Sequence, residues 1–426
     1  MLMTMPKPST DGLRKRLLPL YVAVGLQGFM LWVPVEKLFM SEIGFDAADV
    51  GVMAAAYSAF VPIVEIPSGL LADRWSRRGV LIVASIALAL TALIGGLSTN
   101  VASYIAAALV LGVYFAMYSG TMDAIVYDTV LEELGDSESF ERRIGRVRLA
   151  ESVTLVASSL VGGWIANLAT PRLTYFLTVP FAALSIVAFL RFREPRLQKT
   201  EDTVPLRRQL AMTYQALIHN RGLLPTVALV VLTSLILGSV FEFGPLWLVA
   251  LAVPAAAFGP YWAGLISTMG IAGLVAGKLP LDGRGAAGLG IGLMTLAAVA
   301  LAVSTHVAVI VVAQVVLAML TVIASIHVTS RLHDAVPSTV RSGVASGVGA
   351  LSWIVFLPFA LSMGAVTNSY GVQTAGWLIT AATVVTGLLW AVLVLRRSSE
   401  SALAEPVSEP AEMTPELVCV PVGVAS

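Results

Sequence analysis

The chain has 426 residues with 26 basic and 26 acidic side chains; 57% of the residues are hydrophobic and 12% are charged. Mean hydropathy is +0.87, whereas soluble domains carry about 25% charged residues. This composition excludes a soluble enzyme, a nucleic-acid-binding protein and a disordered scaffold, and it predicts an all-α integral membrane protein. The single cysteine, Cys419, excludes an intrachain disulfide and a cysteine-based metal site.

Twelve segments are long and apolar enough to span a bilayer, which takes about 20 residues of helix. In chain order they are 17–40, 48–72, 79–98, 101–128, 147–169, 171–192, 222–250, 257–279, 286–304, 306–330, 342–366 and 373–395. The long polar–apolar alternation of barrel strands is absent, so we expect twelve transmembrane helices.

Basic residues indicate how these helices are oriented. All lysines and arginines except Lys37 and Arg172 lie in the N-terminal segment, in alternate connections or at the C-terminal boundary. Such residues are retained on the cytoplasmic side of a membrane. We therefore expect a multi-pass protein of the cell membrane with both termini in the cytoplasm.

A long polar stretch after the sixth span divides the chain into two sets of six spans. The pattern predicts an N-terminal six-helix bundle at 1–192, a cytoplasmic linker at 193–221 and a C-terminal six-helix bundle at 222–396. Residues 397–426 are rich in Glu, Pro, Ser and Ala, and we expect them to form a disordered cytoplasmic tail.

The connection after the second span, 69–79, reads GLLADRWSRRG. Its first glycine allows two helices to approach closely. Asp73 sits at the membrane boundary, where an unpaired carboxylate is costly. Arg77 and Arg78 are near enough to pair with it or with Asp128, which ends the fourth span.

This connection resembles the signature G-x-L-a-D-r-x-G-r-k of the major facilitator superfamily, with Ser76 in place of the second glycine. Residues 277–285 look like a weaker second copy of the signature, and Glu194-Pro195 resembles the short Pro/Glu element that often follows the sixth span in this family. The resemblance, closest to multidrug and antibiotic exporters, implies two pseudo-symmetric six-helix bundles and a cytoplasmic gate. The expected gate residues are Gly69, Asp73, Arg74, Arg77, Arg78 and Asp128. The alternative, favoured for Arg74, is that these arginines only anchor the topology.

Acidic residues inside the expected spans are candidates for carrying a proton or binding a cation. They are Glu65, Asp123, Glu151 and Glu242. Glu65 and Asp123 are the strongest, because apolar surroundings favour proton exchange near neutral pH. Alternatively, each is a permanent partner of Arg146 or Arg148, and this is the favoured interpretation for Glu151.

Charged residues also mark the outer ends of two spans. Glu242 lies near the outer end of the seventh span and is a candidate outer gate. Glu36 and Lys37 end the first span, and we expect them to be interfacial.

Aromatic, amide and methionine side chains in the first and fourth spans are candidates for lining a central cavity. They are Gln27, Trp32, Tyr114, Met117, Tyr118 and Met122. Packing against lipid or other helices is the alternative for each of them.

The sequence contains no G-x4-G-K-[ST], H-E-x-x-H or nucleophile-elbow motif, so we expect no enzyme activity, bound metal or cofactor. We expect a monomer that exports small lipophilic or cationic compounds in exchange for protons, by alternating access. The alternatives are a proton-coupled nutrient uptake symporter and a transporter-like receptor or scaffold.

Overall fold

The computed structural model describes residues 10–135, 139–195, 221–278, 284–336 and 338–404, and every regular element among them is a helix. The helices are α1 (Thr10–Gln27), η1 (Val33–Val35), α2 (Glu36–Glu42), α3 (Ala47–Arg74), α4 (Arg77–Leu97), α5 (Val101–Tyr118), α6 (Thr121–Leu134), α7 (Phe140–Leu168), α8 (Pro171–Arg191), η2 (Arg221–Leu223), α10 (Leu224–Phe243), α11 (Pro245–Ala250), α12 (Ala255–Ala276), α13 (Arg284–Val303), α14 (Val307–Asp334), α15 (Ser338–Tyr370) and α16 (Val372–Ala404). The all-α fold predicted from composition is confirmed.

Eleven helical stretches in the described part of the chain are long and apolar enough to cross a membrane. Two of them combine consecutive helices, α5 with α6 over Val101–Leu134 and α10 with α11 over Leu224–Ala250. Each of the eleven coincides with one of the spans expected from the sequence. The chain is therefore a multi-pass membrane protein.

The first expected span, 17–40, is interrupted. Helix α1 ends at Gln27, and the chain then turns into η1 and α2. Pro34 has no backbone N–H with which to continue a helix. Close packing against α7 fixes the turn, because a Cβ at Gly28 would overlap the side chain of Thr154. The interruption brings α2 into contact with both α8 and α11.

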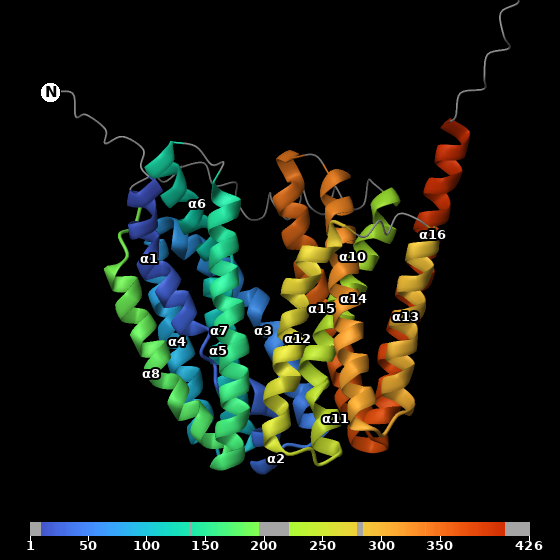
Figure 1. The fold of residues 1–426 in the computed structure, drawn as a ribbon, viewed down its shortest axis with the longest axis horizontal. Coiled ribbons are helices and arrows are strands. Elements are labelled where there is room, and N and C mark those ends of the chain that lie inside the picture. The colour runs from blue at the N-terminus through green and yellow to red at the C-terminus, as the bar shows by residue number, and fades with distance from the viewer. Residues whose placement is uncertain (1–9, 136–138, 196–220, 279–283, 337, 405–426) are drawn as a thin grey trace, which may run out of the picture.

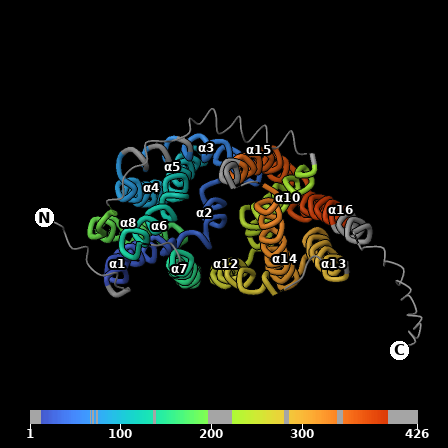
Figure 2. The backbone as a smooth tube through the Cα atoms, turned by 90° about the horizontal axis from the view of Figure 1, so that it is seen from above, coloured from blue at the N-terminus to red at the C-terminus, as the bar shows by residue number. Residues whose placement is uncertain are grey.

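Helices α1–α8 and α10–α16 form two halves that lie side by side (Figure 1, Figure 2). Within the first half, α4 packs against α5 and α8; within the second, α13 packs against α14 and α16. The halves meet mainly along two helix pairs, α3 with α15 and α7 with α12, and also where η1 and α2 contact α12 and α11. A space between the halves is therefore bordered by helices from both.

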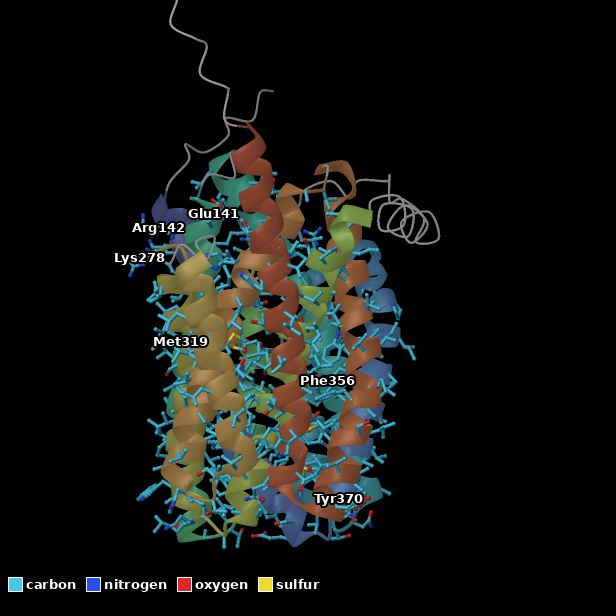
Figure 3. The ribbon with its side chains drawn as sticks, turned by 90° about the vertical axis from the view of Figure 1, so that its right-hand side faces the viewer. Glu141, Arg142, Lys278, Met319, Phe356 and Tyr370 are labelled. Atoms are coloured by element: carbon cyan, nitrogen blue, oxygen red, sulfur yellow. The ribbon has the colours of Figure 1, made fainter. Side chains whose placement is uncertain are left out.

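Charged side chains distinguish the two ends of this helical bundle. Arg142 and Lys278 lie at one end and Tyr370 at the other (Figure 3). We call the first the basic end; α1 begins there, whereas α2 and α11 lie at the opposite end (Figure 1). Lys37 belongs to α2 and so lies at the opposite end, as the distribution of basic residues predicts.

One expected boundary near the C-terminus is wrong. Helix α16 continues to Ala404, past residue 397, where the sequence predicted the disordered tail to begin. Residues 405–426 of that tail, and 196–220 of the expected linker, lie outside the described residues.

Candidate substrate cavity and its gates

A cavity of about 690 Å³ lies between the two halves. Helices α3, α5 and α7 form one side of its wall, and α10, α12 and α15 form the other. Its aromatic lining residues are Trp32, Tyr57, Phe115, Phe241, Trp262, Trp353 and Phe356. The rings of Tyr57 and Trp353 meet edge to face across the halves, with centroids 5.9 Å apart. Such a wall suits a bulky, partly apolar molecule.

An ion pair joins the halves at the opposite end of the cavity. Lys37 of α2 donates a hydrogen bond to Glu242 of α10 at 2.5 Å, and its Nζ lies 3.2 Å from Glu36. The ammonium side chain is 1% exposed. Glu36 also accepts a hydrogen bond from the hydroxyl of Tyr104 at 3.0 Å. The cluster thus holds two carboxylates around one cation, and both carboxylates line the cavity.

The sequence predicts interfacial positions for Glu36 and Lys37, and for Lys37 this prediction is wrong. The interruption after α1 turns α2 inward, so that Lys37 is buried between the halves. Glu242, predicted to be an outer gate residue, is the partner of Lys37 in the other half.

Glycine pairs bring the two halves into backbone contact near the same end. A Cβ at Gly51 of α3 would lie 2.7 Å from the carbonyl oxygen of Ala360 and 2.9 Å from Gly364 of α15. A Cβ at Gly163 of α7 would lie 2.6 Å from the backbone nitrogen of Gly259 in α12. Only glycine fits such close approaches without displacing a helix.

The cavity is more open toward the basic end. Phe115 and Met269, which line it nearer that end, are 41% and 47% exposed. Trp32 and Trp262, which line it nearer the opposite end, are 3% and 8% exposed. The structure is therefore closed at the opposite end and accessible from the basic end.

A second charged group lies on the wall of the cavity toward the basic end. Arg148 of α7 donates to both carboxylate oxygens of Asp123, at 2.9 and 3.1 Å. Their side chains are 55% and 44% exposed. Glu151, one turn along α7, lines the cavity and accepts a hydrogen bond from Tyr118 at 3.5 Å.

This arrangement changes two interpretations of the sequence. For Asp123 the structure favours the alternative, a partner of Arg148. For Glu151, favoured as an ion-pair partner, the described residues form no salt bridge to it, although the charge of Arg148 on the same helix acts on its carboxylate. The physical reason is the break before α6: Gly120 has a φ of +69° and redirects the chain that carries Asp123.

Glu65 does not line the cavity, although its side chain is exposed. It lies on α3 seven residues beyond Ser58, a lining residue. Residues seven apart share a helix face. Glu65 therefore lies on the cavity face of α3, two turns nearer the basic end.

The described side chains of the expected gate motif bind to their own half of the protein. Arg77 pairs with Asp128 and donates to the carbonyl of Ala124 at 3.2 Å. Ser76 caps α4 by accepting from the backbone of Gly79 at 2.9 Å, which explains why a serine serves in place of the signature glycine.

Glu194 ties the same motif to the end of α8. Its carboxylate accepts from the Ser76 hydroxyl at 2.6 Å and from the Arg78 backbone at 3.3 Å. Arg78 also donates to the carbonyl of Phe192 at 3.2 Å. Gly69, Asp73 and Arg74 belong to α3, but the surroundings of Gly69 and the side chains of Asp73 and Arg74 lie outside the described part of the structure.

Of the six side chains predicted to line the cavity, Trp32 does so. The residues lining this cavity do not include the other five, which are Gln27, Tyr114, Met117, Tyr118 and Met122. Gln27 is buried within the N-terminal half and donates to Ser85 at 2.9 Å. Tyr114 and Tyr118 stack on each other beside the wall, with centroids 5.6 Å apart.

Several lining residues were not foreseen, among them Phe241, Trp262, Trp353 and Phe356. A signal existed for the last two, because aromatic residues three apart lie on one helix face. Trp262 has a similar signal in Phe258 four residues before it, whereas Phe241 has no comparable pattern in the sequence.

Comparison with known proteins identifies the family. The profile of the Major Facilitator Superfamily matches residues 17–357. Multidrug resistance protein 2 of Bacillus subtilis (strain 168) is 26% identical over 167 residues, which are 39% of this chain and 40% of that protein. The chain thus matches less than half the length of this relative.

Solved transporter structures share the fold. The nucleoside transporter NupG has a TM-score of 0.70 at 12% identity, covering 90% of this chain and 98% of that one. A peptide transporter POT has a TM-score of 0.72 at 14% identity (92% and 96% covered), and a D-xylose-proton symporter 0.66 at 14% (88% and 97% covered). The profile match over most of the sequence shows that this chain belongs to the Major Facilitator Superfamily and is a transporter of small molecules, not an enzyme.

Proposed function

We propose that this transporter exports small lipophilic or cationic compounds in exchange for protons. Its basic end would face the cytoplasm of the cell membrane, with the bundles at 1–192 and 222–396 rocking against each other. The observation that carries the proposal is the Glu36–Lys37–Glu242 cluster, which joins the halves at the closed end of an aromatic cavity.

The composition of the cavity supports this substrate class. Its aromatic wall favours apolar compounds, and the acids Glu36, Glu151 and Glu242 favour cations. The only lining arginine in the described residues, Arg148, is already paired with Asp123, so an anion has no free guanidinium to bind. The partial similarity to a multidrug resistance protein points in the same direction.

The charged cluster suggests how binding leads to opening. Lys37 holds the other half through Glu242, so a cationic substrate beside Glu242, or a proton on it, weakens the contact between the halves. A buried pair with one partner neutralised is strongly destabilised. Cation or proton arrival would therefore release the closed end and allow the cavity to open there, which is one half of an alternating-access cycle.

Everted membrane vesicles with a respiration-generated proton gradient test the proposal. The lipophilic cation tetraphenylphosphonium, a neutral lipophilic compound and an organic anion are added while a pH-sensitive dye reports the lumen. We expect the first two to release protons with the wild type. Empty vesicles and a Lys37→Met variant should give no release.

Two results would contradict the proposal. Silence with every compound would remove proton-coupled export. Gradient-driven accumulation of a nutrient in right-side-out vesicles would instead favour the uptake symporter.

A further inference from the structure

A second, smaller pocket lies entirely within the C-terminal half, between α13, α14 and α16. It measures about 50 Å³ and shares no lining residue with the central cavity. One water-sized group needs about 10–15 Å³ of such space, so the pocket has room for a few methylene groups. It is therefore separate from the central cavity.

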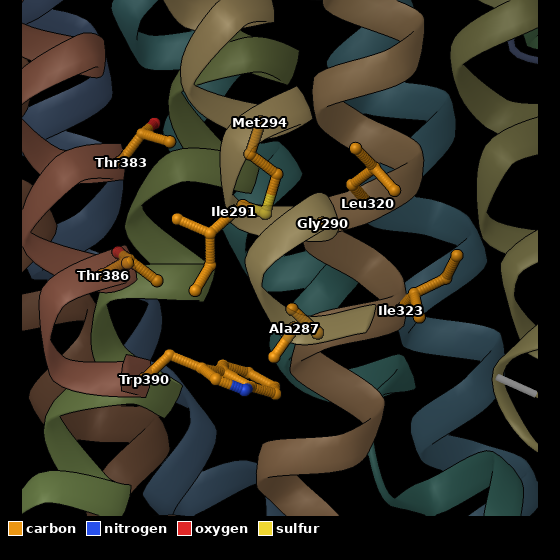
Figure 4. A pocket seen from close by; sticks show the side chains of 11 residues that line it. Ala287, Gly290, Ile291, Met294, Leu320, Ile323, Thr383, Thr386 and Trp390 are labelled. Atoms are coloured by element: carbon orange, nitrogen blue, oxygen red, sulfur yellow. The ribbon is translucent and has the colours of Figure 1, made fainter. Parts of the chain in front are cut away.

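The wall of this pocket is apolar over most of its length. Its larger side chains are Ile291, Met294, Leu320, Ile323 and Trp390, with Thr383 and Thr386 on α16. Figure 4 shows Met294 and Thr383 at one end of the pocket and the indole ring of Trp390 at the other. Both threonines make hydrogen bonds to their own helix, to Ile379 and Ala382, and so offer the pocket little polarity.

Trp390 brings an unused donor to this apolar site. Its side chain is 3% exposed, and its Nε1 has no hydrogen-bond partner among the described residues. A buried N–H group without an acceptor is costly. A ligand that fills the pocket and presents a carbonyl oxygen would remove this cost.

The guanidinium of Arg331 lies near the end of the pocket that Trp390 lines. The Cζ of Arg331 lies 5.5 Å from the centroid of the Trp390 ring. Arg331 is in the last turn of α14, at the basic end, where a membrane-spanning helix reaches the headgroup region. From the membrane surface inward, the cation of Arg331 comes first, the amphipathic indole of Trp390 second and the apolar pocket third. A phospholipid presents its phosphate, ester and acyl chain in the same order.

We propose that this pocket binds a few methylene groups of one acyl chain of a membrane phospholipid, with an ester carbonyl accepting from Trp390 and the phosphate beside Arg331. The glycines of α13 allow a matched test. A Cβ at Gly290, which lines the pocket, meets no atom within 4 Å, and the same is true at Gly292, which is exposed and outside the lining. Gly290→Leu therefore fills the pocket, whereas Gly292→Leu adds the same side chain elsewhere on the helix.

Native mass spectrometry of the detergent-purified full chain, titrated with dioleoylphosphatidylglycerol, measures the site directly. We expect the wild type and Gly292→Leu to bind one lipid with equal affinity, and Gly290→Leu to bind it at least tenfold more weakly. Trp390→Phe keeps an aromatic ring but removes the indole N–H, so its affinity should fall about fivefold. Glycerol phosphate, which has the headgroup without the chains, should neither bind nor compete.

The proposal is overturned if Gly290→Leu binds lipid like Gly292→Leu, or if Trp390→Phe binds like the wild type. Competition by glycerol phosphate would also overturn it, because the site would then recognise a free phosphate. Lipid binding is the readout, so these results do not depend on the direction or substrate of transport.

Discussion

The two ends of the central cavity are held in different ways. At the opposite end, a buried ammonium and two glycine contacts join one half to the other. At the basic end, the ion pairs of Arg77 with Asp128 and of Arg148 with Asp123 lie within the N-terminal half. Among the described residues, the charged and glycine contacts between the halves are therefore concentrated at the closed end.

The two ends also differ in the free energy that is lost when one of their charged contacts is removed. Removing one partner of a buried ion pair costs about 3–5 kcal/mol, because the remaining charge stays in an apolar site. Exposed pairs contribute about 0–1 kcal/mol. Variants at the opposite end should therefore affect transport more than comparable variants at the basic end.

The largest effect is expected for Lys37→Met, which leaves Glu36 and Glu242 facing each other without a cation. Transport of tetraphenylphosphonium should fall roughly a hundredfold, in line with the loss of a buried partner. Lys37→Arg should retain part of the activity. Lys278→Met, at the exposed basic end, serves as the control and should transport normally. Equal activity of the two methionine variants would show that the buried pair has no role.

A smaller loss is expected for Gly364→Leu. A Cβ there would lie 2.7 Å from the carbonyl of Ala47 and 2.8 Å from Gly51, so a larger side chain drives α3 and α15 apart. We expect transport to fall about tenfold, the scale of overpacking a tight contact. In a Cys419→Ser background, the thiol of a Ser58→Cys substitution should become reactive toward a thiol reagent added from the opposite end.

Gly349→Leu is the control for Gly364→Leu, because a Cβ at Gly349 on the same helix meets no atom within 4 Å. It should leave both transport and thiol reactivity unchanged. Normal thiol protection in Gly364→Leu would mean that the glycine contact does not seal the cavity.

Trp353→Ala should act on binding and leave the gates unaffected. It removes one ring from the cavity wall and the contact with Tyr57. A cation near an aromatic ring gains about 1–2 kcal/mol, so KM for tetraphenylphosphonium should rise about tenfold with little change in kcat. Trp377→Ala, which removes a ring that is 50% exposed on α16, should leave KM unchanged. A change in kcat alone would argue against a binding role.

The smallest effect is expected for Asp123→Asn. Its ion pair with Arg148 is half exposed, so its loss should reduce transport about threefold or less. Rates of proton-driven export at several pH values provide the measurement. A complete loss of export would instead identify Asp123 as a proton carrier, the role first suggested by its place in the span.

Most of the fold was predictable because bilayer thickness sets the length of each apolar segment. Eleven spans follow this rule directly. The interruption between Gln27 and Glu36 was not predictable from hydropathy, since it depends on Pro34 and on the close contact of Gly28 with α7. The position of Lys37 was consequently missed.

The cavity wall was harder to predict than the spans. In a membrane protein the lipid and the interior are both apolar, so hydropathy does not reveal which face of a helix looks inward. Phe115 lines the cavity while its neighbour Tyr114 packs beside the wall, and adjacent residues differ by about 100° around the helix. The pairing of Asp123 likewise required the turn at Gly120.

The most direct test of the central claim is a pair of spin-label distances between the halves. One pair joins Asn167 and His306 at the opposite end; the other joins Arg142 and Lys278 at the basic end. When tetraphenylphosphonium is added and the pH is lowered, we expect the first distance to lengthen and the second to shorten. The Lys37→Met variant should show the longer first distance even without the compound and without acidification. Unchanged distances, or two distances that change in the same direction, would contradict a gate at Lys37 and the alternation of access that it controls.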